Sequence, residues 1–445
     1  MSNSPRSDEP SAYHDPAGPA VIIDPYSSGA LYAPAFTASG VPVVAVLSAP
    51  EPPDVYASTY RPQDFAEVIV VTDDPAPAVA RLRELRPRCV LPGCESGVEL
   101  ADAVAPLVVP ELANVPELAA ARRHKGEMAA AVRHAGIPVI PQLCTADPAE
   151  VERWILDSGL TGRDLVIKPP KSASTDGVTR IRGGDEWRTT FGGLLGTRNR
   201  LGILNDRVLV QEYVSGTEYV VDTFSHDGTH TVADVCRYRK VDNGGHMAVY
   251  ESMDWLPPDA PEVDEVVGYA RAVLDAVGMR FGAAHAEIMR TPEGCRLIEV
   301  AARPHGGGHP RFCRVATDDS QVDRAVRHLT GGTVPTGYTL ARHVRVVFLI
   351  SRLTGIVTNA ESLDSIHKVP SLLHASIGIR TGDRLSVTKD LFGSLELGFA
   401  VLAHEDPAVI EDDYRRIRRL ESGLRVLPAG PAAPKEDPRP EAARR

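Results

Sequence analysis

The chain has 445 residues, enough for about three structural units at roughly 150 residues per domain. It is 43% hydrophobic and 24% charged with a net charge of −11, a composition typical of globular proteins and without the basic surplus of a general nucleic-acid-binding protein. No apolar run approaches the roughly 20 residues that span a bilayer, and residues 1–20 contain no apolar signal core. We therefore expect no membrane partner, no nucleic-acid partner and a cytoplasmic location.

The chain begins and ends with segments rich in Pro, Ser, Ala and charge, so 1–19 and 428–445 are predicted to be disordered tails. From residue 20, short runs of β-branched residues at 21–23, 41–47, 68–71 and 89–91 predict strands buried on both faces of a parallel sheet, with helices at 77–85 and 95–107 between them. This predicts an N-terminal α/β domain over 20–113.

The central part, 114–334, is predicted to mix helices with antiparallel strands, as α+β, and to include a lid at about 139–212. Its expected helices are 115–136, 186–195 and 261–278, and its expected strands are 165–170, 178–182, 208–214, 218–226, 231–238, 281–290 and 294–300. A C-terminal subdomain over 335–427 is expected to have strands at 343–351, 377–385 and 395–404 and a closing helix at 407–421. The fold class is thus α/β, with a C-terminal mixed sheet.

A loop of small residues follows a buried strand that ends in Lys168. The sequence KPPKSASTDGV over 168–178 lets backbone N–H groups surround an anion while the lysine supplies a compact positive charge. Only seven of the 48 basic residues are lysines, so a lysine here stands out. The loop lacks the Walker pattern and returns into a strand. A flexible turn with a surface lysine is the alternative interpretation.

Two further groups of residues add acidic and basic side chains. Glu212 and Glu218 flank a turn at Gly216, where they could bind an amine or a ribose diol, or could simply be solvated charges at strand ends. Glu287 precedes Glu299 by twelve residues on a predicted strand pair, where two carboxylates can converge on Mg²⁺.

Arg303 follows the second of these glutamates and offers a fixed fork for a carboxylate or phosphoryl group. A buried Glu–Arg ion pair is the alternative. His305 and His309 lack a second cluster of ligands in the sequence, so no zinc site is expected.

In this order the motifs resemble the ATP-grasp superfamily of carboxylate–amine ligases, and most closely its L-amino-acid (dipeptide) ligase branch. The resemblance rests on these motifs together with PGCESG at 92–97, HKGEM at 124–128, LIEVAARPHGGG at 297–308 and IGIRTGD at 377–383. It implies an ATP-grasp fold, with the N-terminal α/β domain, the central lid and the C-terminal sheet described above. It also implies ATP and Mg²⁺ as cofactors, with two ions that Mn²⁺ can replace, and amino acids as substrates. Members are often dimers, which leaves a homodimer open here.

The resemblance implies roles at the matching positions. The ATP site would comprise Lys125, Lys168, Ser172, Ser174, Gly177, Glu212, Val214 and Glu218. Glu287 and Glu299 would hold magnesium. Arg303 and Lys240 would be catalytic, on the substrate carboxylate and the γ-phosphate. The substrate pocket would comprise Glu95, His246, Arg303, His305 and Gly307.

One position departs from the pattern. Members commonly carry an asparagine two residues after the second metal glutamate, and this chain has Ala301 there. One oxygen ligand of the expected set is therefore missing, and a water could replace it. The expected reaction is ATP-dependent activation of an amino-acid carboxylate as an acyl phosphate, followed by attack of a second amino acid's amine. The same chemistry on a glutamate γ-carboxylate or a natural-product intermediate is an alternative, and a non-catalytic ATP-binding protein is a more distant one.

Overall fold

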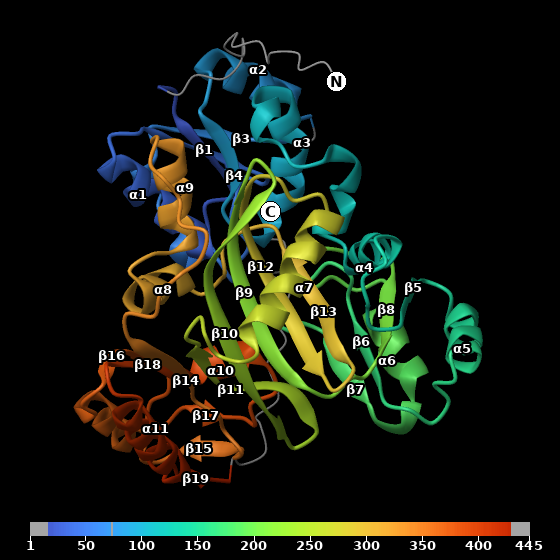
Figure 1. The fold of residues 1–445 in the computed structure, drawn as a ribbon. Coiled ribbons are helices and arrows are strands. Elements are labelled where there is room, and N and C mark those ends of the chain that lie inside the picture. The colour runs from blue at the N-terminus through green and yellow to red at the C-terminus, as the bar shows by residue number, and fades with distance from the viewer. Residues whose placement is uncertain (1–16, 73, 429–445) are drawn as a thin grey trace, which may run out of the picture.

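The computed structural model describes residues 17–72 and 74–428, so the predicted tails lie almost wholly outside the described residues. The chain begins with a parallel α/β unit, blue at the top of Figure 1. Its four strands have the order β3-β2-β1-β4. They are β1 (Ala20–Ile23), β2 (Val43–Leu47), β3 (Glu67–Val70) and β4 (Cys89–Pro92), and the helices are α1 (Tyr32–Ala38), α2 (Ala76–Leu85) and α3 (Val98–Val108). Because β1 and β2 are buried along their whole length, their apolar runs predicted them correctly.

The segment after this unit differs from its prediction. The long helix expected over 115–136 is wrong in its first half, where two 3-10 turns, Pro116–Leu118 and Ala120–Arg122, precede α4 (Lys125–His134). Buried Arg122 holds these turns together by donating to the carbonyl oxygens of Val115 and Val277. The helix proper starts where the His124 side chain accepts from the Glu127 backbone N–H, which satisfies a free donor of the first turn.

The segment predicted as a lid forms a separate four-stranded antiparallel sheet, here called the lid sheet, with two helices packed on it, at the right of Figure 1. Its strands, in the order β5-β8-β6-β7, are β5 (Gln142–Thr145), β6 (Leu165–Lys168), β7 (Thr179–Ile181) and β8 (Val208–Glu212). The helices α5 (Pro148–Asp157) and α6 (Trp187–Leu194) share an apolar core with the strands through Val151, Trp187 and Phe191.

The largest element is an eight-stranded antiparallel sheet of order β13-β12-β9-β10-β11-β14-β18-β16. The strands are β9 (Thr217–His226), β10 (Thr229–Asn243), β11 (His246–Trp255), β12 (Gly282–Thr291), β13 (Gly294–Ala301), β14 (His343–Phe348), β16 (Leu372–Ile377) and β18 (Gly398–His404). β11 pairs with β14, so one sheet crosses the predicted boundary at 334/335. No strand was predicted from the sequence at β11.

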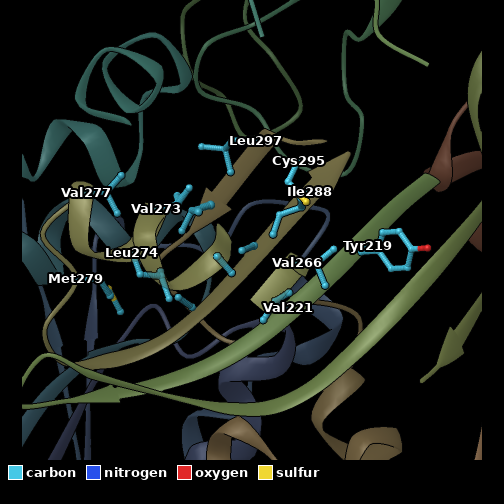
Figure 2. Packing of buried hydrophobic residues seen from close by; sticks show 14 of the residues in the cluster. Tyr219, Val221, Val266, Val273, Leu274, Val277, Met279, Ile288, Cys295 and Leu297 are labelled. Atoms are coloured by element: carbon cyan, nitrogen blue, oxygen red, sulfur yellow. The ribbon is translucent and has the colours of Figure 1, made fainter. Parts of the chain in front are cut away.

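Helix α7 (Val263–Ala276) covers part of this sheet, as Figure 2 shows. Its apolar stripe, with Val266, Val273 and Leu274, packs on Val221 of β9 and Ile288 of β12. These side chains are fully buried. The packing fixes the strands that carry the glutamates at positions 287 and 299.

The C-terminal part adds helices α8 (His309–Thr317), α9 (Gln321–Leu329), α10 (Leu391–Leu397) and α11 (Pro407–Ser422) and a small sheet of β15 (Gly355–Val357), β17 (Arg384–Leu385) and β19 (Val426–Leu427). The strand predicted over 377–385 is wrong, because the Asp383 carboxylate accepts from the Arg380 N–H and Gly382 has φ +97°, which makes a turn. The start of the strand predicted over 395–404 is also wrong, because Asp390 caps α10 there. No helix in the described ranges is long and apolar enough to cross a membrane.

Candidate active site

A cavity lies where the lid sheet, the large sheet and the loop after β13 meet. It is lined by these residues of the predicted site: Lys125, Lys168, Ser172, Ser174, Glu212, Val214, Glu218, Lys240, Glu287, Glu299, Arg303, His305 and Gly307. The chain therefore brings residues more than 180 positions apart into one space.

Three predicted site residues are not among the residues that line the cavity. Glu95 lies behind it and contacts Arg303. Gly177 closes the small-residue loop with φ +74°, where an added Cβ would lie 2.9 Å from the Pro169 ring. His246 begins β11 in the β10–β11 hairpin, and its neighbour Met247 lines the cavity instead.

The two predicted metal glutamates face each other across a strand pair. Glu287 of β12 and Glu299 of β13 are direct register partners, so their side chains leave the same face of the sheet. Lys125 Nζ lies 2.7 Å from Glu299 Oε2. Burial opposes ionisation of Glu299, but Lys125 and Lys168 outweigh it and lower its pKa to about 2. Two carboxylates at one point fit a hard cation such as Mg²⁺.

Lys125 and Lys168 approach this point from two elements, the start of α4 and the end of β6. Lys125 Nζ also donates to the Ser172 carbonyl oxygen, which ties it to the small-residue loop. Burial, reinforced by the neighbouring Lys125, lowers the pKa of Lys168 to about 8. A lysine so desolvated gains much from an anionic partner, which suits it to a phosphate.

The lid end of the cavity is more apolar. Ile140, Val166 and Val214 line it beside Gln211 and Tyr213. Glu212 forms an ion pair of 2.8 Å with Arg163. Apolar walls with a few polar groups and accessible main chain are typical of a pocket for a planar ring.

Glu218 and Lys240 are bound to each other at the edge of this region. Lys240 Nζ donates to both Glu218 oxygens at 2.7 and 2.8 Å. Burial raises the pKa of Glu218, and Lys240 partly offsets that effect. Glu218, predicted to bind ribose, and Lys240, predicted to bind the γ-phosphate, are thus paired with each other in this structure.

Arg303 forms an ion pair, although not with either metal glutamate. Its Nε donates to Glu95 Oε2 at 3.0 Å, while Arg123 Nη1 lies 3.1 Å from Glu95 Oε1. All three residues are largely buried. Two guanidinium groups against one carboxylate leave a surplus positive charge, and Arg303 presents it to the cavity.

A group of buried histidines and aspartates, here called the His–Asp cluster, forms the wall beyond Arg303. It comprises Asp222, Asp234, His285, His305 and His309. Asp222 accepts from His285 Nδ1 at 2.9 Å and from His305 Nδ1 at 2.8 Å, and His309 Nε2 lies 2.9 Å from Asp234. Tyr238 hydroxyl contacts His305 Nε2 at 3.1 Å. The cluster brings His305 and His309 the acidic neighbours that their sequence spacing did not indicate.

Protons balance the charges within this cluster. Burial alone would lower the pKa of His285 and His309, but Asp222 and Asp234 raise both to about 9. Burial and the two neighbouring imidazoles lower the pKa of His305 well below its usual range. Two imidazolium ions therefore match two carboxylates.

The comparisons with known proteins agree on the fold of this site. Residues 161–310 match the family model of the ATP-grasp domain. Dapdiamide A synthase of Enterobacter agglomerans is 28% identical over 412 residues, covering 90% of this chain and 95% of that protein. The crystal structure of the L-amino acid ligase from Bacillus licheniformis superposes with a TM-score of 0.67 at 14% identity, covering 93% of this chain and 99% of that one. N5-carboxyaminoimidazole synthetase from Staphylococcus aureus, complexed with ADP, gives 0.63 at 15%, covering 91% and 98%.

The chain contains an ATP-grasp domain over residues 161–310. It is an ATP-dependent ligase of the ADP-forming type that makes carbon–nitrogen bonds. As in the ATP-grasp fold of its structural neighbours, a lid sheet and a large antiparallel sheet enclose the cavity between them.

Sequence reasoning missed several residues of the candidate site. Asp222, Tyr238 and His285 were assigned no role, and neither was Arg123. One signal was available: His285 stands two residues before Glu287 on a strand, so both must share a face. Asp222 gave a weaker signal, as a carboxylate inside the apolar run of β9.

Proposed function

We propose that the protein joins two amino acids, activating the carboxylate of one as an acyl phosphate and transferring it to the amine of the other, with release of ADP and phosphate. The observation that carries the proposal is the meeting, in one cavity, of the Glu287–Glu299 pair, two lysines from opposite sides and Arg303. The likeness to an L-amino acid ligase and to dapdiamide A synthase supports it.

The reaction requires that the substrate carboxylate and the ATP phosphates, which are both anionic, are held close together. A carboxylate oxygen attacks the γ-phosphorus of ATP, and the bond to ADP breaks. The amine nitrogen then attacks the acyl carbon, and phosphate leaves with its electron pair. Magnesium, when bound, neutralises charge on the phosphates.

The chain's own residues would divide the remaining work. Lys125 and Lys168 would hold phosphate oxygens, and Arg303 would hold the substrate carboxylate in line. The surplus charge of the Arg123–Glu95–Arg303 group suits that second anion.

The acyl phosphate must be kept from water, which would hydrolyse it. The small-residue loop borders the cavity at Ser172, Ser174 and Thr175, and Thr175 contacts the start of α10, where its Oγ1 lies 3.4 Å from the Leu391 N–H. A loop held at both the lid sheet and the C-terminal part would cover the triphosphate.

Release of ADP tests the proposal. The full chain is incubated with Mg·ATP and all pairs of the twenty amino acids, and product masses are read in parallel. Products whose mass equals the sum of a pair minus water are expected. ATP binding with no turnover across the panel would contradict dipeptide formation and favour a non-proteinogenic substrate or a binding role.

The nearest rival uses the same chemistry on a side-chain carboxylate or a natural-product intermediate. The similarity to dapdiamide A synthase supports this alternative. A product that forms only with glutamate as the carboxylate donor, and that yields a γ-linked fragment in tandem mass spectra, would decide for it.

A further inference from the structure

The two strands that carry the metal glutamates have a second cross-strand pair beside the first. Glu287 lies opposite Glu299, and His285 lies opposite Ala301. Alternate residues of a strand share a face, so positions 285, 287, 299 and 301 make one patch. Ala301 is the position where an oxygen ligand was expected, and its methyl group offers none. The residue facing this gap is a histidine.

The ring of His285 is oriented by Asp222. Its Nδ1–H donates to Asp222 Oδ1 at 2.9 Å, and Asp222 is fully buried. This leaves Nε2 directed at the patch, 3.3 Å from Glu287 Oε1. Histidines that ligate metals usually donate their other ring N–H to a carboxylate, which orients the ring and raises the basicity of the ligating nitrogen.

The separation of these two atoms suits neighbouring ligands of one ion. Ligands at adjacent corners of an octahedral ion with bonds of 2.0–2.1 Å lie about 3 Å apart. His285 lines the same cavity as both glutamates and is itself almost fully buried.

We propose that His285, oriented by Asp222, is a ligand of the divalent cation, which displaces the Nε2 proton to solvent on binding, and that it supplies the coordination that Ala301 cannot. Asp222 is then a positioning residue for the metal site. The inference rests on the nucleotide and metal part of the proposed function and is independent of which substrates are joined.

The chemistry of the ligand predicts metal preference. Imidazole nitrogen binds transition-metal ions well, whereas Mg²⁺ prefers oxygen. The site should therefore gain more from Mn²⁺ than an all-oxygen ATP-grasp site would. A protein with Asn at 301 and no histidine at 285 should lose that advantage.

Pulsed electron paramagnetic resonance on the full chain with Mn²⁺ and ADP tests this without turnover. Labelling the histidines with ¹⁵N should convert a ¹⁴N modulation of the Mn²⁺ signal into the ¹⁵N pattern, which separates imidazole from adenine nitrogen. The histidine ¹⁵N pattern should disappear in His285→Gln. It should persist in His134→Gln, a control at the exposed end of α4. Absence of histidine coupling in the unsubstituted chain would overturn the inference.

Metal affinities give a second readout. In His285→Gln we expect the Kd of Mn²⁺ to rise about 10-fold or more, and that of Mg²⁺ less than 3-fold. Adding Ala301→Asn should lower the Kd of both metals by a similar factor, so the preference for Mn²⁺ and the nitrogen signal both stay lost. If His285→Gln weakens both metals equally, His285 only donates a hydrogen bond to Glu287, and the inference is wrong.

These results are separable from the fate of the proposed function. If His285→Gln does not fold, the labelled unsubstituted chain decides alone. Histidine coupling with no dipeptide product would leave this inference standing while the proposed function fails. Dipeptide products without histidine coupling would do the reverse.

Discussion

Two groups of buried polar side chains meet at the cavity, and they balance their charges differently. On the phosphate side, four basic side chains, Lys125, Lys168, Arg123 and Arg303, face three acidic ones, Glu95, Glu287 and Glu299, which leaves one surplus positive charge. Lys168 has a lowered pKa of about 8. In the His–Asp cluster, imidazolium ions and carboxylates match, and Asp222 and Asp234 are fully buried. The first group is suited to receive anions, while the second balances its own charges.

This difference separates function from stability. Substitutions on the phosphate side should reduce turnover with little loss of folding free energy, because the site is incomplete until the anions bind. Substitutions in the His–Asp cluster should cost folding free energy first, because they leave buried partners unmatched. His285 touches both groups, since its ring lies between Asp222 and Glu287.

Asp222→Asn should give the largest effect. The carboxylate accepts from two imidazoles and also lies 3.1 Å from His309 Nε2, and an amide cannot accept at both of its ends. Breaking a buried charge pair costs about 3–5 kcal/mol, so we expect an unfolding free energy lower by about 4 kcal/mol. Urea unfolding measures it. A loss below about 1 kcal/mol would mean that the cluster does not stabilise the fold.

Arg303→Ala should reduce turnover much more than it reduces stability. Turnover should fall about 10²–10³-fold, or about 3–4 kcal/mol, because a preorganised charge on the reacting group is removed. Stability should change less, since Arg123 still pairs with Glu95. ADP release and thermal unfolding measured side by side check both halves. Arg303→Lys is the matched control: it keeps the charge without the planar fork, so it should recover only part of the rate.

The phosphate side was largely predictable from sequence because each part is local. A buried strand ending in Lys168 and a run of small residues are contiguous, and Glu287 and Glu299 lie on neighbouring strands of one hairpin. Their types and spacing therefore carry the chemistry.

The His–Asp cluster was not predictable in the same way. Its members come from β9, β10, β12, a loop and α8, and the three on strands are polar residues in largely apolar runs. They meet only because β9 pairs with both β10 and β12, a register that no local pattern fixes. The failed strand at 377–385 has a different, local cause, since a carboxylate–backbone hydrogen bond between Asp383 and Arg380 makes a turn inside it.

The pH dependence of stability should sharpen the comparison. The pKa of His309 is 6.5 unfolded and about 9 folded, so its contribution is complete below pH 6.5 and is lost as pH rises through about 9. We expect the unfolding free energy to fall by about 2 kcal/mol between pH 7 and pH 9 from this group. Urea titrations at several pH values measure it, and His309→Gln should flatten the slope. An equal slope in that variant would assign the dependence to other groups.

Lys171→Met should have the smallest effect, although Lys171 lies only three residues from Lys168. Its Nζ binds Glu99 at 2.6 Å, but the side chains are 33% and 55% exposed, and such pairs contribute about 0–1 kcal/mol. We expect a stability change within about 0.5 kcal/mol and an ATP Kd changed less than 2-fold. Lys168→Met, by contrast, should raise the Kd of ATP at least about 10-fold, because the methionine side chain has no charge with which to bind phosphate. Isothermal titration of both variants with ATP compares them directly. Equal losses would mean that Lys171 leaves Glu99 when nucleotide binds and takes part in holding the phosphates.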